Sequence, residues 1–179
     1  MMDIAEKNMR CVNSKGEDME GGTAALRHKF FTEIVPNCKS LIFLLLTKRP
    51  QNFLKQIPAE WIESPPPNVM YGTSPVDPAT FKNLVPALLK VPGKRFLSIE
   101  PQLANLNPTL AELEGIDWVI QGGESGPKRR PFDTDWARNM KAICRLAGIP
   151  YFFKQVDKVL PIPEDLHIRQ FPEYHSFWP

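Results

Sequence analysis

Residues 41–50 read LIFLLLTKRP, an abrupt change from six apolar residues to threonine, lysine and arginine. A continuous apolar run of this length is typical of a strand that is buried on both faces, and such strands are usually parallel to their neighbours. The segment therefore predicts a buried parallel strand over Leu41–Leu46, with polar residues at its C-terminal end.

Four further segments repeat this pattern of an apolar strand that closes on a polar cluster. The spacing between successive strands leaves room for one crossover helix each, which predicts parallel strands with right-handed crossovers. The four predicted strands are Asn68–Tyr71, Arg95–Ile99, Asp117–Gln121 and Pro150–Phe153.

The segments between these strands carry helical spacing and helix boundaries. Asp77 and Pro78 mark the start of a helix that contains Pro86, and Asp133 and Gly148 bound another. Further helices are predicted over Thr23–Val35, Gln51–Ile62 with a break near Pro58, and Pro108–Leu113, and a short edge strand over Leu166–Gln170.

These elements predict an α/β fold of about five parallel strands with crossover helices, shaped as an open partial (βα) barrel. Residues 21–179 form one domain in this interpretation. Residues 1–20 are polar and without periodicity, and we expect them to be poorly ordered.

The composition of the chain argues against several classes of protein. Lysine and arginine total 22 against 20 acidic residues, a near-balance that gives no general attraction to nucleic acid. The longest apolar run is far shorter than a membrane helix needs, and no signal peptide is visible. The three cysteines are widely spaced, which predicts no metal or iron–sulfur site and favours reduced thiols in a cytoplasmic protein.

Ligands of parallel α/β proteins bind beyond the C-terminal ends of the strands. The sequence becomes polar at this end of all five predicted strands. This favours a shared ligand pocket over the alternative, in which each strand merely ends at the solvent-exposed surface. No catalytic residue and no metal ligand can be assigned. The candidate ligand-binding residues are Lys48, Arg49, Ser74, Ser98, Glu100, Gln121, Gly122, Gly123, Glu124, Ser125 and Lys154.

Two of the candidates are cations that follow the first strand. Lys48 and Arg49 could hold a carboxylate or phosphate, or could lie in an exposed turn. Glu100, which Pro101 helps to orient, either faces the pocket or pairs with one of these two cations.

The last two strands contribute the other candidates. Lys154 is predicted to be a partly buried cation, and Glu124 is its natural partner. Gly122 and Gly123 would let a ligand approach the backbone closely. The basic run 128–130 is interpreted as a solvated loop rather than a nucleic-acid patch.

Five motifs in fixed order resemble the uncharacterised bacteriophage family named after phage gene products thirty-seven and sixty-eight. The resemblance runs from about Phe30 to Pro172. The motifs are Phe43–Pro50 (FLLLTKRP), Gly72–Ser74 (GTS), Arg95–Pro101 (RFLSIEP), Asp117–Gly126 (DWVIQGGESG) and Phe152–Gln155 (FFKQ).

That family resembles the radical S-adenosylmethionine enzymes. The full-length members of the phage family carry a three-cysteine segment that would bind a four-iron four-sulfur cluster. The segment and the first two strands have no counterpart in this sequence. The resemblance therefore implies a truncated member that retains a polar ligand pocket. S-adenosylmethionine and the cluster are implied only for full-length relatives. The alternative is a non-catalytic binding or assembly module of phage or prophage origin.

The predicted first strand has no upstream neighbour, which leaves an apolar sheet edge that invites pairing. We expect self-association, most simply as a homodimer meeting near Leu41–Leu46, or a partner chain at this edge. If the N-terminal residues or Leu166–Gln170 fold back, they would cover the edge instead. Membrane and nucleic-acid partners are not expected.

Overall fold

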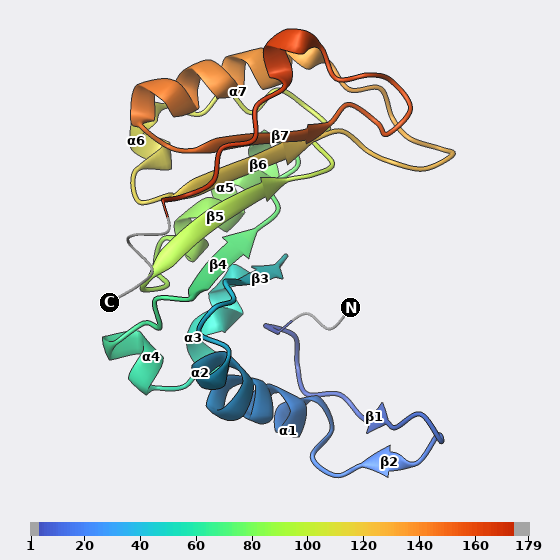
Figure 1. Ribbon diagram of the computed structural model, residues 1–179, viewed down its shortest axis with the longest axis vertical. Coiled ribbons are helices and arrows are strands. Elements are labelled where there is room, and N and C mark those ends of the chain that lie inside the picture. The colour runs from blue at the N-terminus through green and yellow to red at the C-terminus, as the bar shows by residue number, and fades with distance from the viewer. Residues whose placement is uncertain (1–3, 174–179) are drawn as a thin grey trace.

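A five-stranded parallel sheet forms the centre of the molecule (Figure 1). The computed structural model describes residues 4–173. The strands lie side by side in their order along the chain and confirm the predicted set, each within two residues of its predicted bounds. They are β3 (Phe43–Thr47), β4 (Val69–Thr73), β5 (Lys94–Ile99), β6 (Trp118–Gly122) and β7 (Tyr151–Gln155).

Helices connect these strands where the sequence predicts them. The chain breaks between α3 and α4 at Pro58, and Asp77 caps α5 by accepting the backbone N–H of Thr80 at 2.8 Å. The helices are α1 (Gly22–Lys29), the π-helical η1 (Phe30–Ile34), α2 (Val35–Asn37), the 3-10 helix η2 (Pro50–Asn52), α3 (Phe53–Gln56), α4 (Glu60–Glu63), α5 (Pro78–Leu88), α6 (Leu110–Leu113), α7 (Thr134–Ala147) and the 3-10 helix η3 (Glu164–Leu166).

The sequential strand order fixes which face of the sheet the helices cover. Right-handed crossovers between strands that follow one another all lie on the same face, as in (βα) barrels. Side chains alternate between the faces, so Tyr71, Leu97 and Val119 enter the main core on the helical side. Met70 and Phe96 form a second apolar cluster with neighbouring residues on the opposite side, which we call the open face.

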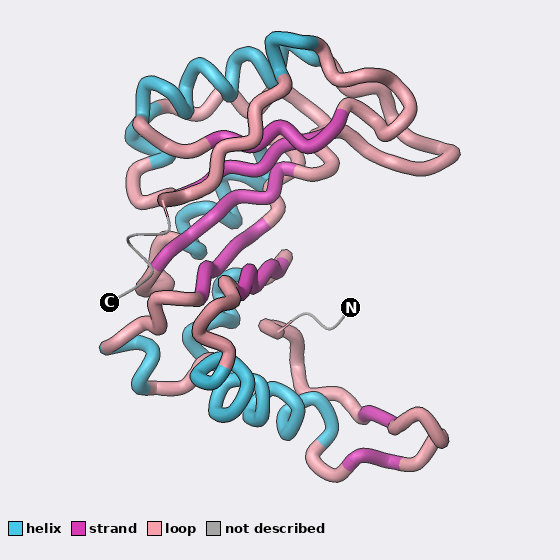
Figure 2. The backbone as a smooth tube through the Cα atoms, viewed as in Figure 1, coloured by secondary structure: helices cyan, strands magenta, loops and turns pink. Residues whose placement is uncertain are grey.

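The C-terminal segment lies along the outer edge of β7 (Figure 2). Phe153 N–H donates to Ile168 O at 2.9 Å and Gln170 N–H donates to Tyr151 O at 3.0 Å. The edge strand predicted over Leu166–Gln170 is thus reduced to one antiparallel bridge, between Phe152 and Arg169. This segment covers the edge of β7 and leaves the edge of β3 at the other side of the sheet.

The N-terminal segment, for which the sequence predicts poor order, contains a short hairpin of β1 (Cys11–Val12) and β2 (Asp18–Met19). Ile4 and Ala5 precede it and are buried. The Arg27 guanidinium on α1 holds this segment by donating to Ile4 O at 3.1 Å. Residues 1–3 of the same prediction lie outside the described residues. Within residues 4–173, no helix combines the length and apolar character needed to cross a bilayer.

Candidate functional site

Two serine hydroxyls lie side by side on the open face, at the C-terminal ends of β4 and β5. Thr73 pairs with Leu97, so Ser98 on β5 and Ser74, which directly follows β4, are the next residues along the two segments. Alternation places both side chains on the face that carries Phe96. Both residues are buried, and neither hydroxyl hydrogen-bonds to another residue in the described part of the chain. These hydroxyls therefore remain available to a ligand.

Glu100 and Lys154 add charge at the same strand ends. Lys154 Nζ lies 2.8 Å from Glu100 Oε2, and the Glu100 side chain is 19% exposed against 47% for Lys154. The ion pair joins the end of β5 to β7. We call Ser74, Ser98, Glu100 and Lys154 the open-face rim.

The partners that the sequence suggested for this pair are wrong. Glu100 contacts neither Lys48 nor Arg49, and Lys154 does not contact Glu124. Lys154 shares the open face with Phe152, because side chains on a strand alternate. The chain after Gly123 instead carries Glu124 into a loop.

Glu124 is held in that loop by Arg130. The guanidinium donates to both carboxylate oxygens, at 2.7 and 2.6 Å, and the backbone N–H of Arg130 donates at 2.9 Å. The side-chain hydrogen bond from Arg130, followed by its backbone N–H, lowers the pKa of Glu124 to about 2. Ser125, the next residue, is exposed. Arg130 therefore compensates the charge of Glu124, and the pair holds the loop in place.

The two cations after β3 lie at the surface. Arg49 forms an ion pair with Glu6, and its backbone N–H donates to Thr47 Oγ1 at 3.0 Å. Lys48 is exposed and forms no ion pair with any residue that the structure describes. Neither cation is joined to the open-face rim by a hydrogen bond or ion pair within the described chain.

Gln121 lies on the helical side of the sheet and is fully buried. The Tyr151 hydroxyl donates to Gln121 Oε1 at 2.5 Å and lies 3.3 Å from the carbonyl oxygen of Ala137. Gln121 Nε2 donates to Gln102 Oε1. Sequence reasoning missed Gln102 and Tyr151, although a glutamine within a strand buried on both faces requires partners of this kind.

Gly122 ends β6 and Gly123 follows it, and at Gly123 the close approach of the backbone excludes a side chain. A Cβ on Gly123 would lie 2.0 Å from the carbonyl oxygen of Val156. The Gly123 N–H already donates to Gln155 O at 3.1 Å, and Gly122 O accepts from Gln102 N–H at 3.0 Å. These contacts fix the loop between β6 and α7 against β7.

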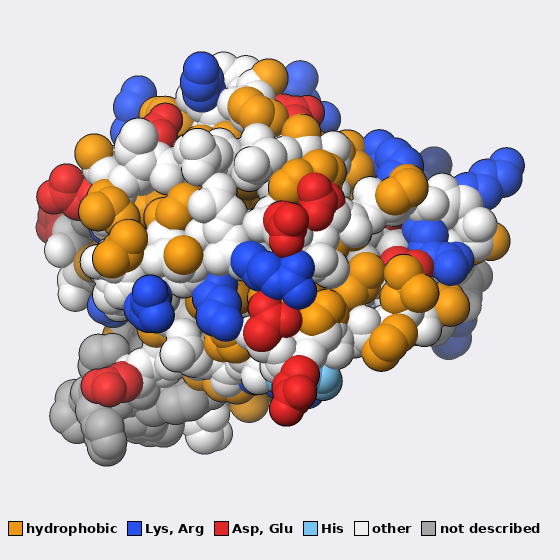
Figure 3. Space-filling view, turned by 90° about the horizontal axis from the view of Figure 1, so that it is seen from above, with side chains coloured by type: hydrophobic (Ala, Val, Ile, Leu, Met, Phe, Trp, Pro, Cys, Tyr) orange, Lys and Arg blue, Asp and Glu red, His pale blue; other side chains and the backbone are white. Residues whose placement is uncertain are grey.

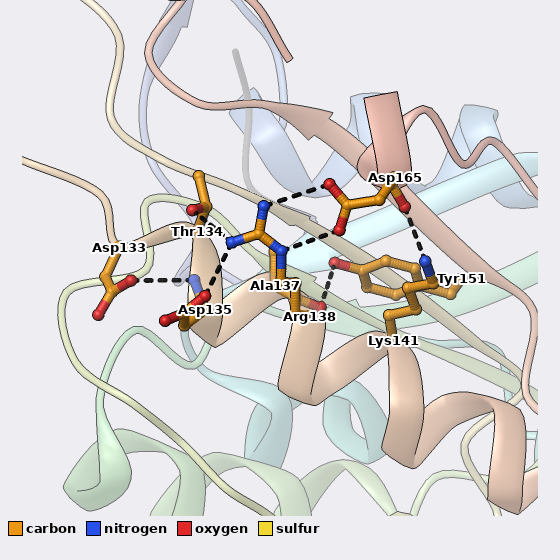
Figure 4. A network of polar contacts seen from close by, with 8 residues as sticks. All are labelled: Asp133, Thr134, Asp135, Ala137, Arg138, Lys141, Tyr151 and Asp165. Atoms are coloured by element: carbon orange, nitrogen blue, oxygen red, sulfur yellow. Dashed lines mark hydrogen bonds and ion pairs between the residues drawn. The ribbon is translucent and has the colours of Figure 1, made fainter. Parts of the chain in front are cut away.

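A polar network on the outer side joins α7 to η3 (Figure 4). Arg138 donates to Asp165 Oδ2 at 2.8 Å and to Asp135 Oδ1 at 2.8 Å. Lys141 Nζ adds a bond to the carbonyl oxygen of Asp165 at 2.7 Å. The network positions the C-terminal segment and has no direct part in the open-face rim.

The basic run 128–130 is largely neutralised. Arg129 pairs with Asp157 and Arg130 with Glu124, which leaves Lys128. In the space-filling view from above, basic and acidic side chains are interspersed over the visible face (Figure 3). The run therefore offers no concentrated positive charge to a phosphate backbone.

The cysteines do not fit an iron–sulfur cluster. Cys11 and Cys38 are half-buried in separate parts of the chain, and Cys144 is buried in the core. Burial raises the pKa of the Cys144 thiol to about 12, which disfavours the thiolate that a metal needs. In the described part of the chain, no three histidine, cysteine or acidic side chains are grouped to hold a metal.

A protein family matches residues 6–164, a range that contains all five strands and the open-face rim. Its description is "Protein of unknown function (DUF5131)". This chain belongs to that family. No curated protein and no solved structure matches the chain. The DUF5131 match starts before the β1–β2 hairpin, so the N-terminal segment is part of the family region, and it ends before the residues that cover β7.

Proposed function

We propose that this DUF5131 protein is a radical S-adenosylmethionine-like protein of phage or prophage origin that binds a small polar ligand at its open-face rim. The observation that carries the proposal is that strand register and alternation put Ser74 and Ser98 at the strand ends on the face that carries the Glu100–Lys154 pair. Ser74 and Ser98 are largely buried residues whose hydroxyls make no side-chain hydrogen bond within the described part of the chain, so they can bond a ligand.

The chemistry of the rim suits a ligand with charges of both signs. The ammonium of Lys154 is half-exposed, so it can reach a ligand anion, and Glu100 can then accept a ligand ammonium. S-adenosylmethionine carries a carboxylate, an ammonium and hydroxyls, and the family resemblance implies it for full-length relatives, so it is a suitable probe of this chemistry. Lys154, Glu100 and the serines would hold these groups.

The proposal assigns binding and no reaction step to this chain. Cys11, Cys38 and Cys144 are not grouped to hold a cluster in the described part of the chain, so the proposal assigns no cluster chemistry to them. In this proposal the open-face rim is a ligand-binding site.

Equilibrium titration with S-adenosylmethionine tests the proposal. Glu100→Gln and Lys154→Met are expected to weaken binding at least about tenfold, because each removes a charge-assisted hydrogen bond of roughly 1.5–3 kcal/mol. Glu63→Gln and Lys82→Met change exposed residues on α4 and α5 and serve as controls. Absence of binding to the wild-type protein, or equal binding by all variants, would refute the assignment.

A second function, a non-catalytic binding or assembly module, is supported by the edge of β3. Among the described strands, β3 pairs only with β4. Natural proteins seldom leave an apolar edge unpaired. In this proposal the chain associates with a second copy or with a partner chain at this edge. Light scattering at micromolar concentration distinguishes dimers from monomers.

A further inference from the structure

A cavity of about 420 Å³ lies between the loop that precedes α7 and the turn that follows β7. Both segments project beyond the C-terminal ends of β6 and β7 (Figure 1). Val156 and Phe132 pack in the core on the helical side, so the cavity is separate from the open-face rim. We call it the loop cavity, and its lining residues are Pro127, Arg129, Arg130, Pro131, Phe132, Val156, Asp157 and Leu160.

Asp157 joins the two walls of the loop cavity. Its Oδ2 pairs with Arg129 Nε on the opposite wall, and its side chain is 9% exposed. Its Oδ1 accepts the backbone N–H groups of Val159 at 2.8 Å and Leu160 at 2.7 Å. Arg129 also donates from Nη1 to the carbonyl oxygen of Gly126 at 3.3 Å. The Arg129 guanidinium is therefore held at the wall before a ligand arrives, which lowers the entropy cost of binding.

The two arginines of the loop cavity keep unused hydrogen-bond donors. A guanidinium carries five N–H groups. Arg129 uses Nε and Nη1, and its Nη2 makes no hydrogen bond in the described part of the chain. Arg130 binds Glu124 through Nε and Nη2, and within residues 4–173 its Nη1 has no partner. Each arginine can therefore donate to an oxyanion without losing its acidic partner.

The charge around the loop cavity favours a single anion. Residues 124–130 and 157–158 contain four basic and two acidic side chains, a net charge of +2. The surplus comes from Lys128 and Lys158, which are exposed and form no ion pair with any residue that the structure describes. It involves too few side chains to follow a nucleic-acid backbone, but it matches a phosphate monoester, which carries about −1.5 to −2 at pH 7.

The remaining lining of the loop cavity is apolar, which points to an organic group on the anion. Leu160 is 58% exposed and Phe132 is partly exposed. An organic group that covers these side chains removes apolar surface from water on both sides of the contact. An inorganic phosphate ion gains nothing from them.

We propose that the loop cavity binds a small phosphate monoester with an aromatic or aliphatic group. The two arginines bond the phosphate oxygens, and the two exposed lysines attract its charge. Phe132 and Leu160 contact the organic group. This site is independent of the ligand proposed for the open-face rim.

Isothermal titration calorimetry with phenyl phosphate, inorganic phosphate and benzoate tests the proposal. We expect phenyl phosphate to bind at least about tenfold more tightly than the other two, because it alone combines a doubly charged phosphate with a ring. Its affinity should fall as salt screens the charges. Lys154→Met, which removes a rim charge, should bind phenyl phosphate like the wild type.

A charge-neutral double variant tests the role of the arginine donors. Glu124→Gln/Arg130→Met keeps the net charge and removes the Arg130 guanidinium, so phenyl phosphate should bind about tenfold more weakly. Leu160→Ser should reduce the advantage of phenyl phosphate over inorganic phosphate, because it removes an apolar contact.

A second pair of variants tests the surplus charge. Lys128→Met/Lys158→Met should weaken phenyl phosphate binding about threefold at low salt. Lys82→Met/Lys90→Met makes the same change in net charge at exposed positions on and after α5, and it should leave binding unchanged. Circular dichroism confirms that each variant is folded. The proposal would be overturned by a folded wild type that does not bind phenyl phosphate, by equal affinity for phenyl phosphate and inorganic phosphate, or by unchanged binding in the loop-cavity variants.

Discussion

Lys154 and Glu100 form an ion pair, Nζ to Oε2 2.8 Å, although β6 lies between the two strands that carry them. Alternate strands of a sheet are about 9–10 Å apart. Both side chains must therefore lean toward each other over the end of β6. The pair thereby links the end of β5 to β7 across the intervening strand.

Removing the Lys154 charge should affect ligand binding far more than stability. The pair is partly exposed, and such ion pairs contribute at most about 1 kcal/mol. We expect Lys154→Met to change the free energy of urea unfolding by less than about 1 kcal/mol while it weakens ligand binding. A loss of several kcal/mol would show that the pair is structural.

Gly72→Ala should destabilise the open face. A Cβ at this position would lie 2.3 Å from ring carbons of Phe96, which is buried and cannot move freely. Overpacking of this kind costs about 1–3 kcal/mol. Urea unfolding of Gly72→Ala, Phe96→Leu and the double variant checks the cause. The double variant should be more stable than the sum of the single changes predicts.

Tyr151→Phe should cost about 1–3 kcal/mol, because it leaves Gln121 Oε1 buried without its donor. Tyr71→Phe is the matched control. Its hydroxyl is also buried on the helical side but has no hydrogen-bond partner in the described part of the chain. Thermal unfolding should therefore separate the two variants, with Tyr71→Phe neutral or stabilising. Equal losses would exclude the glutamine network as the cause.

Arg138→Met should loosen the C-terminal segment locally. The guanidinium bonds Asp165 on η3, so its removal weakens the link to α7 and leaves the bond from Lys141 to the Asp165 carbonyl oxygen. We expect faster amide hydrogen exchange in residues 164–170, with little change in the five strands. Arg145→Met, an exposed change near the end of the same helix, provides the comparison. Unchanged exchange in residues 164–170 would mean that the backbone bridge to β7 suffices.

Asp157 should make stability depend on acid pH. The backbone N–H of Leu160, followed by the Arg129 side chain, lowers the pKa of Asp157 to about 2. A depressed pKa contributes stability above the ordinary aspartate pKa near 3.8, and this contribution is lost as pH falls toward 2. Asp157→Asn should show a smaller loss of stability between pH 4.5 and 2 than the wild type, in urea titrations at each pH. Glu63→Gln, which removes a carboxylate without an ion pair to a described residue, should behave like the wild type.

The strands and most helices could be predicted because their signals are local. The apolar run before Thr47 marks β3, and Asp77 and Gly148 mark helix ends by their own backbone chemistry. The hairpin β1–β2 has two-residue strands and no apolar alternation, so it leaves no comparable signal. The single bridge at Arg169 depends on contacts with β7 rather than on the segment itself.

The sequence predicts where the candidate site lies but not which of its side chains contact one another. The polar ends of the strands indicate where side chains gather, but the pairing among them depends on which face each side chain takes. Gln121 lies two residues after buried Val119 on the same strand, so both side chains point toward the helices. Lys154 lies two residues after Phe152, so both of these side chains point to the open face. The bulge between Gln121 and Gly122 then shifts the register, which no short motif reveals.

The strand order also has a consequence for biosynthesis. Each strand from β4 onward pairs with the one that left the ribosome just before it, so the sheet can grow by one βα unit at a time during translation. Under this order β3 is the first strand available and β7 the last. The residues that shield β7 emerge directly after it. The β3–β4 pair can therefore form before the strands that carry Ser98 and Lys154 have been synthesised.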